Sequence, residues 1–203
     1  MKQEISISKS DIDKKICVIG LGYIGLPTGA VLAKSGYQVH GVDINLDTVA
    51  AVQNGQSTIE EPGLSELLKD VVGKGLLTAS DKVEVSDIYI ICVPTPFTST
   101  KKPDLSFVQS AARQIKDFIK PGDMIILEST SPPRTTEKIV QKETLGSKFK
   151  VGVDVFVAHC PERVIPGRIL DEVINNDRIV GGVTTTCSVK VAEFYESFVN
   201  GKG

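Results

Sequence analysis

Three glycines, Gly20, Gly22 and Gly25, have the spacing GxGxxG and follow a largely apolar run at residues 15–19. A strand that turns through such glycines into an apolar helix places a pyrophosphate on the helix N-terminus, where backbone N–H groups attract anions. Asp43 ends the next apolar run, 18 residues after the last glycine (43 − 25). A carboxylate there can accept both ribose hydroxyls of an adenosine and repels a 2′-phosphate. This pattern predicts an NAD site.

Polar residues also follow the later apolar runs. They are Thr95 after 87–93, Ser129 and Thr130 after 124–127, and Glu162 and Arg163 after 153–158. If these runs are parallel strands, their carboxyl ends share one edge of the sheet, where open α/β sheets bind ligands. A hydroxyl can donate to a developing oxyanion, a carboxylate can act as a base or orient water, and a guanidinium suits a diphosphate. We therefore expect a site longer than an adenosine needs.

Alternating strands and helices must position these residues. We predict strands at residues 15–19, 37–42, 76–79, 87–93, 124–127, 153–158 and 179–182, and helices at 24–34, 46–54, 64–72, 104–119, from 135, and at 184–199. This order favours a Rossmann-like, doubly wound α/β fold, with a mainly parallel sheet and helices on both faces. We predict an NAD-binding Rossmann domain over residues 14–203, preceded by a polar tail at residues 1–13.

The composition excludes several classes of protein. The 203 residues have a formal net charge of −2, with 41% hydrophobic and 24% charged residues. No basic run supports binding to nucleic acid or a membrane surface, and no apolar run approaches the roughly 20 residues of a membrane span. The cysteines, Cys17, Cys92, Cys160 and Cys187, lack CxxC spacing. We therefore expect neither a metal site nor a disulfide framework, and a reducing cytoplasm is the default location.

A purely structural role, without a ligand, remains open for several of these residues. Asp43 could only cap a strand, and Thr95, between two prolines, could only form a rigid turn. Glu162 and Arg163 could form an exposed ion pair worth less than about 1 kcal/mol. Cys187, near a predicted helix start, is the cysteine that we expect to be the most reactive.

Four segments have the residues and the order along the chain that are typical of a known family. They are residues 20–27, 93–96, 128–132 and 160–167. Together they resemble the UDP-glucose/GDP-mannose dehydrogenase family, from about Lys15 to Val199, and their details are most similar to members that act on UDP-N-acetyl-D-mannosamine. The family oxidises the C6 alcohol of a UDP- or GDP-sugar to a carboxylate with two NAD⁺ in succession. The resemblance implies a role in polysaccharide precursor synthesis and a homodimer or higher oligomer for a full-length protein.

The resemblance also implies roles for individual residues. NAD would be contacted by Gly20, Gly22, Tyr23, Ile24, Gly25, Asp43, Thr95, Ser129 and Thr136. Thr130 and Glu162 would act at the reacting carbon, and Arg163 and Val164 would contact the sugar nucleotide. At Arg134 the family often has glycine, and the role of this arginine stays open.

The sequence departs from the family in one respect. Family members carry a catalytic cysteine in a Gly-Gly-His-Cys segment, together with a lysine and an asparagine, beyond the position of Gly203. Cys160 is not the nucleophile in the family pattern. We therefore expect that this chain alone binds NAD without turnover. The alternatives are a dehydrogenase of UDP-glucose, UDP-N-acetylglucosamine or GDP-mannose, or a non-catalytic NAD-binding module.

Overall fold

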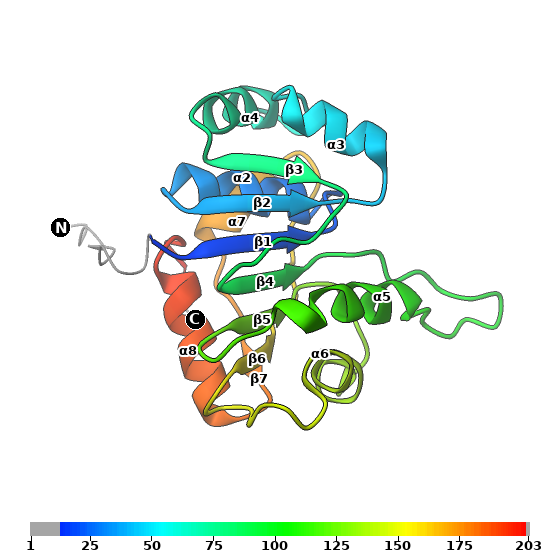
Figure 1. Ribbon diagram of the computed structural model, residues 1–203. Helices are drawn as coiled ribbons and strands as arrows, with labels where there is room; N and C mark the ends of the chain where they lie inside the picture. Colours follow the sequence, from blue (N-terminus) through cyan, green and yellow to red (C-terminus); the bar gives the residue numbers. More distant parts are fainter. Residues whose placement is uncertain (1–12, 202–203) are drawn as a thin grey trace.

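One sheet of seven strands organises the part of the chain that the computed structural model describes, residues 13–201. The strands are β1 Lys15–Ile19, β2 Gln38–Val42, β3 Leu77–Ser80, β4 Ile88–Ile91, β5 Met124–Leu127, β6 Phe156–His159 and β7 Gly181–Gly182. Their order is β3-β2-β1-β4-β5-β6-β7, from top to bottom in Figure 1. Every neighbouring pair is parallel except β6 with β7. The predicted mainly parallel sheet is confirmed.

Helices cover both faces of the sheet, as predicted. They are α2 Gly25–Lys34, α3 Leu46–Gln53, α4 Leu64–Gly73, α5 Ser106–Ile115, α6 Lys142–Leu145, α7 Ile169–Asn175 and α8 Thr185–Glu196. A 3₁₀ turn, Lys116–Phe118, follows α5, and a π-helix, Thr136–Gln141, precedes α6. Alternate β1 residues enter opposite cores, Ile16 with α2, α4 and α8, and Cys17 with α5 and α6. This period of two is expected of a strand covered on both faces.

The structure departs from the predicted elements in three places: one helix was not predicted, and two strands have other bounds. Helix α7 was not predicted, although its buried residues Ile169 and Val173 pack against α2. The strand predicted at 153–158 begins only at Phe156, because a turn at residues 152–154 precedes it. The strand predicted at 179–182 is reduced to the two residues Gly181–Gly182, which pair with β6 in antiparallel orientation. The predicted tail at residues 1–13 lies outside the described residues, except Asp13.

Strand order reverses beside β1, and this reversal decides where a ligand can bind. β1 pairs with β2 on one side and with β4 on the other, so the chain leaves β3 at one edge and re-enters the sheet in its middle. The arrowheads of the parallel strands point to the same side in Figure 1. Ligands of open α/β sheets bind outside the carboxyl ends at such a switch point. No helix within residues 13–201 is long and apolar enough to cross a membrane.

Candidate functional site

A cavity of about 530 Å³ lies at the carboxyl edge of the sheet, beside the switch point between β1 and β4. Its lining contains most of the predicted site residues: Gly20, Gly22, Tyr23, Ile24, Asp43, Thr95, Ser129, Thr130 and Glu162. Loops that follow five different strands, β1, β2, β4, β5 and β6, therefore contribute to one cavity. Four predicted residues, Gly25, Thr136, Arg163 and Val164, are not part of its lining.

The glycine loop leaves room for a ligand between β1 and α2. Gly20 has φ +95°, and a Cβ on it would lie 2.7 Å from the carbonyl oxygen of Cys92. A Cβ on Gly25 would overlap the carbonyl oxygen of Gly20, so this glycine allows α2 to pack against the loop. A Cβ on Gly22 would meet no atom within 4 Å, and this residue lines the cavity. The N–H groups of Leu26 and Thr28 donate to the carbonyl oxygens of Gly22 and Ile24, and Pro27 has no N–H. The open space therefore suits a pyrophosphate through the positive end of the α2 dipole beside the glycine loop.

Asp43 is fixed by backbone donors from both sides. Its Oδ2 accepts a hydrogen bond from the Leu21 N–H at 2.8 Å, and its Oδ1 accepts one from the Asn45 N–H at 2.9 Å. A carboxylate has further lone pairs, so these two bonds leave it able to accept from ribose hydroxyls. Asp43 therefore ties the glycine loop to β2, as a structural residue would, and also lines the cavity. The two interpretations of this residue are compatible.

The hydroxyl groups after β4 and β5 connect the loops that carry them. Thr95 Oγ1 donates to the Thr130 carbonyl oxygen at 2.6 Å, and Ser129 Oγ donates to the Val93 carbonyl oxygen at 2.7 Å. Both hydroxyl protons are therefore engaged within the protein, while both oxygens can still accept. Thr130 is exposed at the cavity edge. Thr95 thus joins the loop after β4 to the loop after β5 and forms part of the cavity wall.

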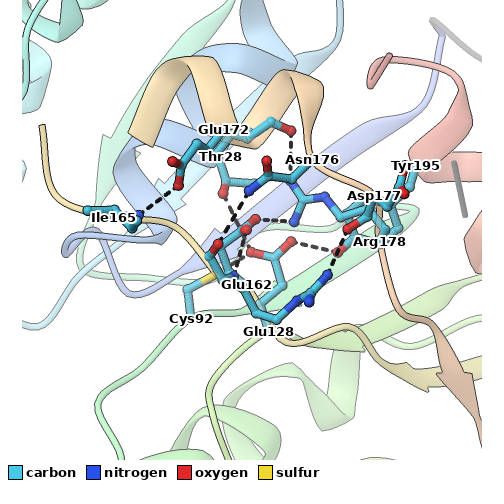
Figure 2. Close-up of polar contacts among 12 residues, drawn as sticks. Thr28, Cys92, Glu128, Glu162, Ile165, Glu172, Asn176, Asp177, Arg178 and Tyr195 are labelled. Carbon is cyan, nitrogen blue, oxygen red and sulfur yellow. Dashed lines mark hydrogen bonds and ion pairs between the residues drawn. The ribbon is translucent and has the colours of Figure 1, made fainter. Parts of the chain in front are cut away.

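Glu162 points inward and pairs with an arginine other than its neighbour (Figure 2). The side chains of Glu162 and Arg178 are both 2% exposed and form an ion pair. The Arg163 N–H donates to Glu162 Oε1 at 2.8 Å, whereas the guanidinium of Arg163 donates to the Asp177 carbonyl oxygen at 3.1 Å. The interpretation of Glu162 and Arg163 as an exposed ion pair was therefore wrong. Glu162 is a buried, oriented carboxylate at the cavity wall.

A second buried carboxylate, Glu128, lies beside this pair. Its Oε1 accepts from the Tyr195 hydroxyl at 2.6 Å, and its Oε2 accepts from the Cys92 thiol at 3.3 Å and the Thr28 hydroxyl at 3.5 Å. Burial raises the pKa of Glu128, while Arg178 acts in the opposite direction. The Arg178 guanidinium lies 5.1 Å from the centre of the Tyr195 ring, within the range of a cation–π contact.

We call Glu128, Glu162, Arg178 and Tyr195 the carboxylate cluster. Roles for Glu128, Arg178 and Tyr195 were not predicted from the sequence. Glu128 carried a usable signal, because it follows the apolar run of β5 directly and is 1% exposed. Arg178 lies in the loop before β7 and Tyr195 on α8, so neither is close in sequence to the carboxylate that it contacts.

The loop after β6 is held in place by two other buried carboxylates. Glu61, from the connection between α3 and α4, accepts from the N–H groups of Gly167 at 2.8 Å and Ile169 at 2.7 Å. Glu172 accepts from the Ile165 N–H at 2.8 Å. The loop carries Arg163, which is exposed and lies outside the cavity lining.

The cysteines have little access to solvent. Cys17, Cys160 and Cys187 are fully buried, and Cys92 is 9% exposed at the cavity wall. Burial raises the pKa of Cys160 to about 12, which disfavours its reactive thiolate. Cys187, which we expected to be the most reactive cysteine, is also fully buried, and its sulfur accepts from the Val157 N–H at 3.3 Å. No group of three potential metal ligands occurs in the described part of the chain.

Comparison with known proteins agrees with the family resemblance of the sequence motifs. The model of the UDP-glucose/GDP-mannose dehydrogenase family, NAD binding domain, matches residues 14–199. A UDP-N-acetyl-D-mannosamine dehydrogenase of Methanococcus maripaludis is 49% identical over 193 residues, which are 93% of this chain and 43% of that relative. An NDP-N-acetyl-D-galactosaminuronic acid dehydrogenase of Ralstonia nicotianae is 46% identical over 200 residues, 95% of this chain and 47% of that relative.

Solved structures agree on the fold. The native structure of the UDP-N-acetyl-mannosamine dehydrogenase Cap5O from Staphylococcus aureus has a TM-score of 0.89 and 46% sequence identity, and the match covers 93% of this chain and 46% of that one. The chain thus spans less than half the length of the relatives that it matches.

Proposed function

This chain belongs to the UDP-glucose/GDP-mannose dehydrogenase family, and on that premise we propose that it is the NAD-binding part of a UDP-N-acetyl-D-mannosamine 6-dehydrogenase. The whole protein would oxidise the C6 alcohol to a carboxylate in polysaccharide precursor synthesis, in the cytoplasm and as a homodimer or higher oligomer. The observation that carries the proposal is the single cavity that joins the glycine loop and Asp43 to the buried Glu162. The substrate choice is supported by the loop resemblance and by the similarity to two dehydrogenases named for this sugar.

The residues fit NAD on the geometry of the open glycine loop. The glycine loop and the positive end of the α2 dipole would hold the pyrophosphate, and the Asp43 carboxylate would accept from the adenosine ribose. The Ser129 and Thr95 oxygens would accept from the second half of the dinucleotide. Bound NAD⁺ would supply the hydride acceptor.

Glu162 is the residue that we assign to the reacting carbon. Its ion pair with Arg178 and its bond from the Arg163 N–H hold the carboxylate in one orientation at the cavity wall. A carboxylate so held can orient a water molecule or accept a proton from an alcohol. Thr130, exposed at the cavity edge, can donate a hydrogen bond to an oxygen there.

Calorimetry with the 203-residue chain tests the cofactor assignment. We expect NAD⁺ to bind without steady NADH production from any UDP-sugar. Asp43→Ala should weaken NAD⁺ binding about tenfold, because it removes acceptors for the ribose hydroxyls, and it should narrow the preference for NAD⁺ over NADP⁺. Asp47→Ala is the matched control, because Asp47 is an exposed acid four residues away that does not line the cavity. Equal affinities of the Asp43 variant and the parent chain would remove Asp43 from this role.

A dehydrogenase of another N-acetylated sugar nucleotide is the second candidate, because the Ralstonia nicotianae relative is nearly as similar. Measured turnover of the full-length protein with UDP-N-acetyl-D-mannosamine and UDP-N-acetyl-D-galactosamine separates the two. A higher kcat/KM for the galactosamine compound would overturn the first assignment. No turnover with any sugar nucleotide would favour a non-catalytic NAD-binding module.

A further inference from the structure

The carboxylate cluster contains more acidic than basic groups. Glu128 and Glu162 contribute two carboxyl groups, whereas Arg178 contributes one guanidinium (Figure 2). Glu128 is 1% exposed and Arg178 5% exposed, and the side chain of Glu162 is 2% exposed. If both carboxyl groups were ionised, the cluster would carry an uncompensated negative charge in a site shielded from water.

The other groups that face the cluster do not supply a second cation. Thr28 from α2 and Cys92 from the end of β4 donate to Glu128, and Cys160 lies close by at the end of β6. Burial raises the pKa of Cys92 and Cys160, so both thiols stay neutral. Val173, on α7, contributes a carbonyl oxygen that accepts from Arg178 Nη2 at 2.9 Å. Arg178 is thus the one cation among the described residues that these contacts bring to the cluster.

Two carboxyl groups that share one cation in a buried site do not both ionise readily. Burial and the negative charge of Glu162 both favour retention of a proton by Glu128. The upward shift in the pKa of Glu128 has these causes, burial first and Glu162 among the others, with Arg178 opposing them. The Tyr195 hydroxyl donates to Glu128 at 2.6 Å and so favours its ionised form.

The cluster faces the part of the cavity where a positive charge would arrive. Glu128 and Glu162 both line the cavity, on the β5 and β6 side of the switch point, whereas Asp43 lines it on the β2 side. A dinucleotide with its adenosine ribose on Asp43 and its pyrophosphate at α2 directs its nicotinamide half toward the two glutamates. The nicotinamide ring is cationic in NAD⁺ and neutral in NADH.

We propose that the carboxylate cluster holds one proton in the free protein and releases it when NAD⁺ binds, so that the domain distinguishes NAD⁺ from NADH by charge. This inference rests on the proposed function, because it requires NAD in the cavity. The O–H bond of the protonated carboxyl group breaks, its electron pair stays on the carboxylate oxygen, and the proton passes to the solvent. The cationic ring then replaces the proton as the second positive charge. NAD⁺ affinity therefore rises with pH across the titration of the cluster, and NADH affinity does not.

Calorimetry of the unaltered chain tests the proton count. NAD⁺ and NADH are titrated at one pH into buffers that differ in ionisation enthalpy, and the slope of the observed heat against this enthalpy gives the protons exchanged. We expect release of roughly half to one proton for NAD⁺ and close to none for NADH. Equal proton exchange for the two forms overturns the inference but leaves NAD binding intact. Absence of binding by both forms overturns the proposed function and the inference together.

A matched pair of variants assigns the proton to the cluster. Glu128→Gln keeps the size of the side chain but cannot ionise, so it should abolish the proton release and weaken NAD⁺ binding about tenfold more than NADH binding. Glu137→Gln is the control, because Glu137 is exposed and pairs with Arg134 away from the cavity lining. It should leave both affinities and the proton count unchanged. Proton release that survives in a folded Glu128→Gln chain, with its melting curve checked by circular dichroism, would contradict the assignment.

Discussion

The two sides of the cavity are built from different materials. On the side of β1 and β2 the wall is backbone, and its shape depends on three glycines and one carboxylate held by N–H groups. On the side of β5 and β6 the wall is a set of buried polar side chains, among them the ion pair of Glu162 with Arg178 and the Glu128 carboxyl group bonded to Tyr195. The shape of the first side depends on glycines that lie close together in the sequence and have no Cβ atom. The second depends on charge pairing between distant segments, so the two sides should respond differently to substitution.

The largest effect should come from the backbone-built side. Gly25→Ala places a methyl group against the carbonyl oxygen of Gly20, and no rotamer can relieve an overlap with backbone. We expect a loss of more than about 5 kcal/mol in the free energy of unfolding, measured by urea denaturation.

Gly22→Ala is its matched control, since the added methyl group meets no atom within 4 Å. This variant should fold with nearly parental stability and bind NAD⁺ more weakly, because the methyl group occupies space in the cavity. Equal stability of the two variants would show that the glycines serve only the turn and not the packing of α2.

The charge-built side should respond next most strongly. Arg178→Met removes the cation and leaves two carboxyl groups buried without it, which should cost about 3–5 kcal/mol of unfolding free energy. Adding Glu128→Gln and Glu162→Gln to this variant should recover part of the loss. Arg113→Met is the control, because Arg113 and Glu143 form a partly exposed pair, and it should cost less than about 1 kcal/mol. A similar cost for both arginine variants would mean that the cluster is not a charge-compensated unit.

The pH dependence of stability should also separate the two sides. Glu128 has its pKa raised above the usual 4.5, so between that pH and its folded pKa the folded state binds more protons than the unfolded state. Stability contributed by this group therefore falls as the pH rises through that window. The parent chain should lose stability relative to Glu128→Gln from about pH 5 upward in urea titrations. A constant difference between the two chains would mean that Glu128 does not titrate in the window.

The smallest effect should follow from Arg134→Gly. Arg134 has φ +68°, a left-handed conformation that favours glycine, and its pair with Glu137 is exposed. Relief of the left-handed conformation should stabilise the variant, and loss of the exposed pair should destabilise it by a similar amount. The free energy of unfolding, measured by thermal denaturation, should therefore change by less than about 0.5 kcal/mol. Arg134→Ala keeps the strain and loses the pair, so it should be the less stable of the two. The reverse order would assign Arg134 a contact beyond this pair.

Sequence reasoning reached the backbone-built side, but of the carboxylate cluster it identified only Glu162, for a physical reason. The glycine spacing and Asp43 form a local pattern, because the turn, the helix start and the strand end lie within about 25 residues. Arg178 and Tyr195 reach Glu162 and Glu128 only through the packing of α8 and the last loop on the sheet. Strand periodicity also missed α7, whose position depends on contacts with α2. Tertiary contacts of this kind produce no periodic pattern in the sequence.

The hydrogen bonds that Glu61 accepts from the loop after β6 have a consequence for the order of folding. Its bonds to Gly167 and Ile169 span 106 and 108 residues of chain, whereas the contacts of the glycine loop with β2 are local. Contacts with long sequence separation require closure of a large loop, which slows their formation. During synthesis the bond between the glycine loop and Asp43 can form once β2 and Asp43 have emerged, while the Glu61 carboxylate lacks its partners until more than a hundred further residues have been made. The segment that carries Arg163 and Val164 therefore acquires its shape late, from a residue made long before it.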